Sequence, residues 1–314
     1  MSVLRFVELQ KHITHKFEEN KLDEVHQLID KAIAQYPEAI DKTSYWKASV
    51  YAKQGKKEQA LSTLINVLER GIWWNPQALT NNPDLMSLQS EKDFNEIMEK
   101  CKEELCKHNQ KSKSKLTVMG NPNADIGLFS IHWRASTIKD YAPYWLDKET
   151  EESYFLGFPQ SSQVYGYNSY SWDNGKIALK DLTDTMNEYK LLGKTNQCIL
   201  TGASQGGKLS IELSLQNYFT NTNGFIAVIP AIKETASIEE MIKTNLKTIK
   251  EKSLKGCIIT GNKDPFYQKT IELKPMFESY QIPCKWFVIE GLAHYFPNHF
   301  LDLVHEGIHF VKQS

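Results

Sequence analysis

The sequence has no long hydrophobic run and no excess of charge of either sign. No apolar stretch approaches the roughly 18 residues that a membrane-spanning helix needs. The 314 residues include 37 Lys and Arg against 38 Asp and Glu, so the net charge at pH 7 is −1. Balanced charge gives no electrostatic footprint for nucleic acid or a membrane surface. Arg5 and Glu8 interrupt the apolar residues near the N-terminus, which argues against a signal peptide, so we expect a cytoplasmic protein.

The sequence also has few cysteines and no CxxC pair. An odd number of cysteines, three of them within apolar runs, favours buried free thiols in a reducing compartment over a disulfide framework. The five cysteines are Cys101, Cys106, Cys198, Cys257 and Cys284.

Residues 1–110 show only helical periodicity, and part of it repeats. Residues 20–33 match residues 55–68 at an offset of 35, close to the 34-residue period of tetratricopeptide (TPR) repeats. The matched pairs are Asp23 with Glu58, Val25 with Ala60, Ile29 with Leu64, Ala32 with Val67 and Ile33 with Leu68. This pattern resembles a short TPR-like helical domain, and a plain helical bundle is the alternative. A TPR array would offer a concave face to a protein or peptide partner, but packing onto the rest of the chain fits equally well.

From residue 116 onward, short apolar runs alternate with helical segments. Polar, basic residues 107–115 precede this change, and we place the interdomain linker at 111–115 and a second domain at 116–314. We expect strands at 116–119, 126–131, 154–158, 198–201, 225–229, 257–260 and 286–289. We expect helices near 138–148, 176–191, 205–218, 237–252, 268–280 and 298–312. This alternation predicts an α/β fold with a doubly wound, mostly parallel sheet, whose ligands bind at the carboxyl ends of the strands.

One such strand end carries a GxSxG motif made by Gly202, Ser204 and Gly206. An apolar strand precedes it and an amphipathic helix follows, which is the context of a nucleophile elbow that exposes a serine hydroxyl. Glycine at 202 and 206 would provide space and unusual dihedrals in so tight a turn. Gly202 to Lys208 also fits GxxxxGK, but a phosphate-binding loop needs Ser or Thr next, and Leu209 stands there.

Asp264 and His294 complete a possible catalytic triad with Ser204. A serine hydroxyl needs a general base, and the base needs a carboxylate that fixes its tautomer. Asp264 and His294 follow the strands 257–260 and 286–289, in the chain order Ser, acid, His of α/β-hydrolases. Taken singly, Asp264 would be a capping residue and His294 a surface histidine. Weaker candidates for the acid are Glu290 and Glu234.

The tetrahedral intermediate of acyl transfer also needs two hydrogen-bond donors for its oxyanion. We expect the first to be the backbone amide of Gln205, the residue after the nucleophile. The second should come from the loop after the strand 126–131, which runs through His132 to Ser136.

Residues 116–314 resemble the phospholipase/carboxylesterase (predicted esterase) branch of the α/β-hydrolases, which includes acyl-protein thioesterases and dienelactone-hydrolase-like enzymes. The resemblance rests on the motifs described above and on His132-Trp133-Arg134, Tyr141-Ala142-Pro143-Tyr144-Trp145, Pro159-Gln160-Ser161-Ser162-Gln163 and Trp172-Asp173. It implies that the amide of Arg134 is the second oxyanion donor. The sequence departs from the family at Trp133, where the family has glycine. If that position requires a positive φ, tryptophan would be strained there.

A rival metal site is possible in the last predicted helix, where His305, Glu306 and His309 fit HExxH. Such a motif places two histidines on one helix face for zinc, and a third ligand would come from His294 or His299. The apolar stripe Phe300, Val304, Ile308 and Val311 already explains this segment as a packing helix, so we expect no metal and no cofactor.

The sequence therefore predicts a serine hydrolase of the carboxylesterase or thioesterase type that acts on a small-molecule or acyl-group ester. Trp133 and Tyr295 are candidates to line its substrate cleft. The triad does not choose between ester and amide, so a serine peptidase on the same fold stays open. The alternative from another class is an interaction protein in which TPR-like helices bind a partner beside a non-catalytic hydrolase-like domain.

Overall fold

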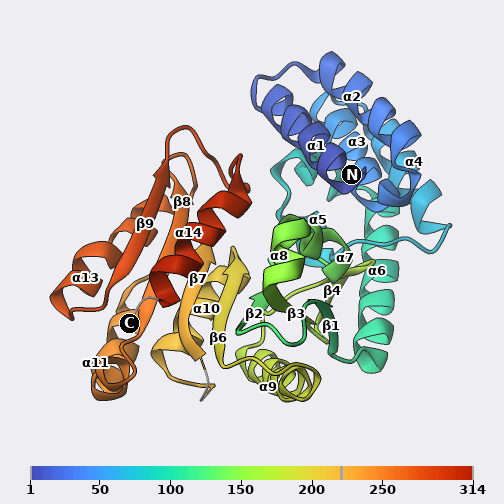
Figure 1. Ribbon diagram of the computed structural model, residues 1–314. Helices are drawn as coiled ribbons and strands as arrows, with labels where there is room; N and C mark the ends of the chain where they lie inside the picture. Colours follow the sequence, from blue (N-terminus) through green and yellow to red (C-terminus); the bar gives the residue numbers. More distant parts are fainter. Residues whose placement is uncertain (1, 220–221, 313–314) are drawn as a thin grey trace. The chain divides into compact units, whose positions relative to one another are not determined.

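The chain forms two compact units in a computed structural model that describes residues 2–219 and 222–312 (Figure 1). The first unit contains the N-terminal residues up to 112 together with residues 164–169. The second contains residues 113–163 and the chain from residue 170 onward. Six residues from the middle of the sequence are thus part of the N-terminal unit, an assignment that no periodicity in the sequence indicated.

The first unit is helical. Its elements are α1 (Ser2–Glu18), α2 (Leu22–Gln35), η1 (Pro37–Ala39), α3 (Ile40–Lys53), α4 (Lys57–Leu68), α5 (Pro76–Asn81), η2 (Pro83–Leu88) and α6 (Lys92–Lys111). The short strand β4 (Val164–Gly166) lies with them and pairs with β5 (Ser169–Tyr170). Helix α6 continues through Lys111, so only residues 112–114 of the expected linker region lack regular structure.

The 35-residue offset in the sequence is visible in the backbone of this unit. Asn20 and Gly55 both adopt left-handed dihedrals, with φ of 57° and 75°. Lys21 and Lys56 then precede α2 and α4 with nearly identical φ and ψ, −87° and 63° against −87° and 65°. The apolar stripes of both helices are buried. The two helices therefore start in the same local geometry, although the resemblance to TPR repeats stays a prediction.

Residues 164–169 are held in the first unit by hydrogen bonds and apolar packing. The Asn75 side chain donates to the carbonyl of Tyr165 at 2.7 Å, and the amide of Val164 donates to the Asn109 side chain at 3.0 Å. Val164 and Tyr167 pack against the apolar core of the unit. These two asparagines pair with backbone groups of residues 164–169, which are half-buried apart from buried Gly166 and exposed Asn168.

The second unit is built on a seven-stranded sheet in the order β1-β3-β2-β6-β7-β8-β9. The strands are β1 (Lys115–Gly120), β2 (Ile126–Ile131), β3 (Tyr154–Gln160), β6 (Gln197–Ala203), β7 (Thr222–Val228), β8 (Lys255–Gly261) and β9 (Cys284–Ile289). Only β1 is antiparallel to its neighbour, and the other pairs are parallel. The predicted doubly wound, mostly parallel sheet is confirmed, and all seven expected strands are present.

Helices cover both faces of this sheet (Figure 1). They are α7 (Ile138–Tyr141), η3 (Ala142–Trp145), α8 (Lys148–Ser153), α9 (Gly175–Leu192), α10 (Gln205–Leu215), α11 (Ala236–Glu251), α12 (Tyr267–Ile271), α13 (Leu273–Ser279) and α14 (Phe300–Lys312). Side chains alternate along each strand, so Leu128 packs with η3 and α14 on one face. Phe129 packs with α9 on the other face. The five central strands are almost completely buried, which is why their sequences are continuous apolar runs.

The helix expected near 138–148 is instead three short helical segments. Pro143 lacks a backbone N–H and cannot continue the α-helical ladder, and the chain tightens there into η3. Asp147 then starts α8 with a reciprocal capping box with Thr150. The prediction of one continuous helix was wrong, because apolar periodicity does not show the break at Pro143 or the new helix start at Asp147.

Two absences in the sequence also have structural counterparts. Within residues 2–219 and 222–312, none of the helices is long and apolar enough to cross a membrane. All five cysteines are free. Burial raises the pKa of Cys198 and Cys257 to about 12, so these thiols are not available as nucleophilic thiolates near neutral pH.

Candidate active site

Ser204 stands at a strained turn between β6 and α10. Its φ of 53° and ψ of −114° lie outside the regions that residues with a side chain favour. The amide of Ser204 donates to the carbonyl of Val228 at 2.9 Å, and its carbonyl accepts from the amide of Ala231 at 3.0 Å. The segment at the end of β7 therefore holds this backbone, and the surroundings offset a cost of about 1–3 kcal/mol that such dihedrals carry.

The flanking glycines are needed because a side chain would not fit at their positions, and not because of their backbone dihedrals. A Cβ on Gly206 would lie 2.0 Å from the carbonyl oxygen of Ile131, and one on Gly202 would lie 2.4 Å from the backbone of Gly206. Neither glycine has a positive φ, whereas Ser204 does. The expected dihedral requirement at Gly202 and Gly206 was thus wrong. The tight turn presses α10 against the end of β2, where any side chain would collide.

The structure brings Ser204, His294 and Asp264 together in one hydrogen-bonded chain. The Oγ of Ser204 lies 2.8 Å from Nε2 of His294, and Nδ1 of His294 lies 2.7 Å from Oδ2 of Asp264. A carboxylate only accepts, so Nδ1 must carry a proton. In a neutral imidazole Nε2 then accepts, and the hydroxyl of Ser204 donates to it. This tautomer places a proton acceptor on the serine.

Burial differs along this chain of side chains. The Asp264 side chain is 1% exposed, whereas that of His294 is 31% exposed. The second carboxylate oxygen of Asp264 accepts from the amide of Phe266 at 2.7 Å, and the Phe266 ring packs edge-on against the imidazole. Asp264 is therefore both a turn-capping residue and the partner of His294, so the two interpretations of its sequence position coexist.

The meeting of these residues follows from the strand order. Ser204, Asp264 and His294 lie in the loops after β6, β8 and β9. These strands belong to the same half of the sheet, in the order β6-β7-β8-β9. In parallel strands all carboxyl ends share one edge, so the three loops converge there. The weaker candidate Glu290 instead accepts a hydrogen bond from Asn262 at 2.6 Å.

The two residues predicted to donate to the oxyanion, Gln205 and Arg134, lie at the start of α10 and in the loop after β2. Gln205 is the first residue of α10, so its amide has no acceptor within the helix. Arg134 lies in the loop after β2, and the carbonyl of Ile131 at the start of that loop faces Gly206 in the elbow. The elbow and the β2 loop are therefore neighbours.

A buried histidine fixes the start of the β2 loop. Nδ1 of His132 lies 2.7 Å from the carbonyl oxygen of Trp133, and Nε2 accepts a hydrogen bond from the backbone amide of Ser161 at 3.4 Å. A carbonyl cannot donate, so Nδ1 carries the proton and the ring is a neutral, defined tautomer. Burial lowers the pKa of His132 to about 4, although its bond to the Trp133 carbonyl opposes this shift.

Trp133 packs in an aromatic cluster and adopts no left-handed dihedral. The left-handed residue of this loop is Ala135, with φ of 60°, so tryptophan at 133 carries no such strain. The Trp133 ring meets Phe296 at 5.8 Å and Tyr144 at 5.7 Å between centroids. Phe296 stacks on Tyr144 at 4.2 Å, and Tyr295 is half-buried beside it in the loop after His294.

Sequence reasoning missed the side chain that connects these loops, Asp173. Its carboxylate accepts from Nε and Nη2 of Arg134 at 2.8 and 2.9 Å, and from Nε2 of Gln205 at 2.9 Å. The amide of Trp172 donates to Oε1 of Gln205, and the Trp172 indole donates to the carbonyl of His132. The Trp172-Asp173 motif is part of the family resemblance, but the sequence alone gives it no role.

The rival metal site does not assemble. Nδ1 of His305 lies 3.2 Å from the hydroxyl of Tyr154, and Glu306 accepts from Lys285 at 2.8 Å. Across residues 2–219 and 222–312, no three His, Cys, Asp or Glu side chains cluster so that they could hold a metal ion. The apolar stripe of α14 is buried against the sheet, as expected for a packing helix.

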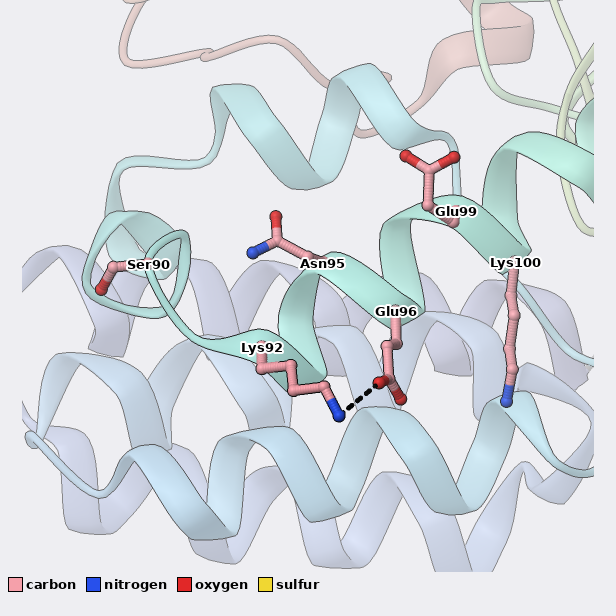
Figure 2. Close-up of a pocket in the computed structure, with 6 residues that line it drawn as sticks. All are labelled: Ser90, Lys92, Asn95, Glu96, Glu99 and Lys100. Atoms are coloured by element: carbon pink, nitrogen blue, oxygen red, sulfur yellow. Dashed lines mark ion pairs between the residues drawn. The ribbon is translucent and has the colours of Figure 1, made fainter.

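An open pocket on the helical unit involves none of the predicted site residues. Figure 2 shows its six polar lining residues, Ser90, Lys92, Asn95, Glu96, Glu99 and Lys100. Lys92 and Glu96 form an ion pair one turn apart on α6, at 3.3 Å. Charges of both signs at this spacing are typical of a solvated helix face.

Comparisons with known proteins agree with this architecture. Residues 5–109 match the family described as A/B hydrolase-like, N-terminal domain. A crystal structure of an uncharacterised protein from Bacillus cereus ATCC 10987 is similar over 98% of each chain, with 20% identity and a TM-score of 0.54. The crystal structure of esterase PE8 is similar over 63% of this chain and 99% of that chain, with 15% identity and a TM-score of 0.50. No curated protein matches the sequence. The α/β-hydrolase fold predicted from the sequence is confirmed.

Proposed function

We propose that this α/β-hydrolase-fold protein is a serine hydrolase that cleaves carboxylic esters or thioesters. The observation that carries the proposal is the hydrogen-bonded chain from Ser204 through His294 to Asp264, at 2.8 and 2.7 Å. These distances lie within the reach that proton transfer requires. The strained backbone at Ser204 supports the same assignment, because strain of this kind is retained where function needs it.

In the proposed acylation step, Oγ of Ser204 attacks the carbonyl carbon of the substrate. Nε2 of His294 takes the hydroxyl proton, and Asp264 stabilises the imidazolium and keeps its orientation. The tetrahedral intermediate then expels the alkoxide or thiolate, which leaves with the proton from Nε2. In the deacylation step, water attacks the acyl-enzyme with His294 as the general base. The carboxylic acid is released and the Ser204 hydroxyl is restored.

The negative charge on the intermediate needs donors that are in place beforehand. The amide of Ser204 donates to Val228, so this amide is already used within the protein. The amides of Gln205 and Arg134 are the proposed donors. A donor of this kind contributes about 10²–10³-fold to kcat in serine hydrolases.

The test is labelling with an active-site fluorophosphonate together with hydrolysis of p-nitrophenyl acetate and of a matched thioester. We expect the wild type to be labelled and active, and Ser204→Ala to lose both labelling and hydrolysis. Ser214→Ala is a matched control, because this buried serine on α10 donates to the carbonyl of Gly224 and not to His294. Full hydrolysis by the Ser204→Ala protein would overturn the assignment.

A peptide amide substrate, added to the same experiment, separates the proposal from its alternatives. A non-catalytic platform for a protein partner predicts no labelling of the wild type. A serine peptidase predicts labelling of Ser204 together with cleavage of the peptide amide that is lost in Ser204→Ala. An esterase or thioesterase predicts labelling with little amide cleavage.

A further inference from the structure

One carboxylate joins the two segments that carry the proposed oxyanion donors. Asp173 lies in the loop between β5 and α9 and accepts two hydrogen bonds from the guanidinium of Arg134, at 2.8 and 2.9 Å. It accepts a third from the side chain of Gln205, at 2.9 Å. Arg134 belongs to the β2 loop and Gln205 to the elbow, so Asp173 bridges the two.

The orientation of the Gln205 amide is determined from both ends. Its nitrogen donates to Asp173, and its oxygen accepts from the backbone amide of Trp172 at 2.9 Å. A flipped amide would lose both hydrogen bonds, since a carboxylate cannot donate and a backbone amide cannot accept. The first residue of α10 is therefore fixed to the 172–173 segment at two points.

The β2 loop is fixed to the same segment at two points as well. Besides the bidentate contact of Arg134 with Asp173, the indole of Trp172 donates to the carbonyl of His132 at 3.0 Å. Trp172 is 3% exposed, so this second attachment is buried. A planar guanidinium that meets a carboxylate through two bonds has one preferred geometry, which restricts where the backbone of Arg134 can lie.

We propose that Asp173 is a positioning residue for the oxyanion hole, which sets the spacing between the backbone amides of Arg134 and Gln205. This inference rests on the proposed function and names a residue outside the Ser204, His294 and Asp264 chain. The side chains that donate hydrogen bonds to Asp173 include those of Arg134 and Gln205. It acts through the two residues whose side chains it binds.

The effect should appear in turnover and not in stability. The side chains of Arg134 and Asp173 are 46% and 43% exposed, and ion pairs in such water-accessible positions contribute little to stability. Burial raises the pKa of Asp173, but the hydrogen bonds from Arg134 and Gln205 outweigh it and lower the pKa below its usual range. Asp173 is therefore a carboxylate at neutral pH and can accept all three bonds.

The experiment compares Asp173→Ala and Asp173→Asn with the wild type in p-nitrophenyl acetate hydrolysis. We expect kcat to fall by about 10–100-fold in Asp173→Ala, less than the loss of a whole donor, with KM within about twofold. Asp173→Asn keeps one acceptor oxygen and should fall between Asp173→Ala and the wild type. Affinity for an alkyl trifluoromethyl ketone, which forms an oxyanion on the serine, should decrease in parallel with kcat.

A matched control is Asp184→Ala, which removes an exposed ion pair with Lys180 on α9 and should leave kcat unchanged. Thermal unfolding of each variant separates lost folding from lost positioning, and the Asn variant serves if the Ala variant does not fold. Unchanged kcat in both Asp173 variants, or a lower kcat with undiminished affinity for the ketone, overturns the inference alone. If Ser204→Ala retains full hydrolysis, the proposed function fails and this inference fails with it.

Discussion

At the scale of single residues, the site combines positions that tolerate no other side chain with one that carries strain. Gly206 leaves room for the carbonyl of Ile131 at a distance that no Cβ could accept. Ser204 takes the unfavourable dihedrals instead. Glycine and serine thus have different roles in this turn. Glycine stands where two backbone segments approach each other closely, and serine stands at the position whose side chain is held out of the sheet.

His132 gives the strongest pH-dependent expectation at this scale. Its pKa is about 4 in the folded protein, against about 6.5 in an unfolded chain. Between these values the unfolded chain binds the proton more readily, so stability is lost as the pH falls from about 6.5 to about 4. The shift corresponds to about 3 kcal/mol in the free energy of unfolding.

We therefore expect the free energy of unfolding of the wild type to fall by about 3 kcal/mol more than that of His132→Asn between pH 7 and pH 4. Asparagine keeps a donor for the carbonyl of Trp133 but cannot titrate. Urea unfolding at several pH values measures the difference, in which the titration of all other groups cancels. Parallel profiles for the two proteins would show that His132 is not buried as a neutral ring.

At the scale of elements, α14 shows how packing decides between two interpretations of one segment. Its HExxH spacing permits zinc, and its apolar stripe permits packing on the sheet. Val304 and Ile308 are buried at 0% and 2% exposure, and the backbone of Gly307 lies against Cys257. The two histidines thus belong to a helix whose position is set by its apolar face.

This assignment predicts that two neighbouring substitutions lower the free energy of unfolding by different amounts. Val304→Ala should lower the free energy of unfolding by about 2 kcal/mol, because it leaves a cavity against the sheet. Glu306→Ala should cost less than about 1 kcal/mol, since its ion pair with Lys285 is exposed. Neither variant should lose Ser204-dependent hydrolysis at a pH and temperature where it is folded. Complete loss of activity in folded Glu306→Ala would favour the metal interpretation.

At the scale of the whole molecule, one of the two compact units includes a segment that is remote in sequence from the rest of that unit. Residues 164–169 leave the α/β segment and belong to the helical unit. The base of this excursion is closed by the amide of Ser171, which donates to the carbonyl of Gln163. Trp172 and Asp173 follow directly. We therefore expect the helical unit to be needed for the folded conformation of 164–169, whether or not it also binds a protein or peptide partner.

Asn75 allows this dependence to be measured. Its oxygen accepts from the amide of Ala78 at the start of α5, and its nitrogen donates to the carbonyl of Tyr165. Asn75→Ala should cost about 2 kcal/mol, from loss of the cap and of the hydrogen bond. Asn75→Ser keeps a capping oxygen and should cost about half as much.

Urea unfolding monitored by tryptophan fluorescence measures both Asn75 variants. The difference between each variant and the wild type separates the cap from the contact with Tyr165. A Ser variant as stable as the wild type would mean that the hydrogen bond to residues 164–169 contributes nothing.

The sequence by itself determined the fold class, the seven strands and the three residues of the Ser204 chain of hydrogen bonds. This was possible because each of these features has a local signature: alternating apolar runs, a glycine-flanked serine, and polar residues directly after strands. The placement of the three residues at one edge of the sheet then required only the general rule that parallel strands share their carboxyl edge.

Only the tertiary structure decided the hydrogen bonds of Asp173, the burial of His132 and the place of residues 164–169. Asp173 is separated from Arg134 and Gln205 by dozens of residues, and no periodicity links an acceptor to donors in other loops. The state of His132 depends on burial, which arises when β2, β3 and the 172–173 segment pack together. Long-range contacts of this kind are properties of the folded chain, because they depend on how elements are brought together and not on what each element is.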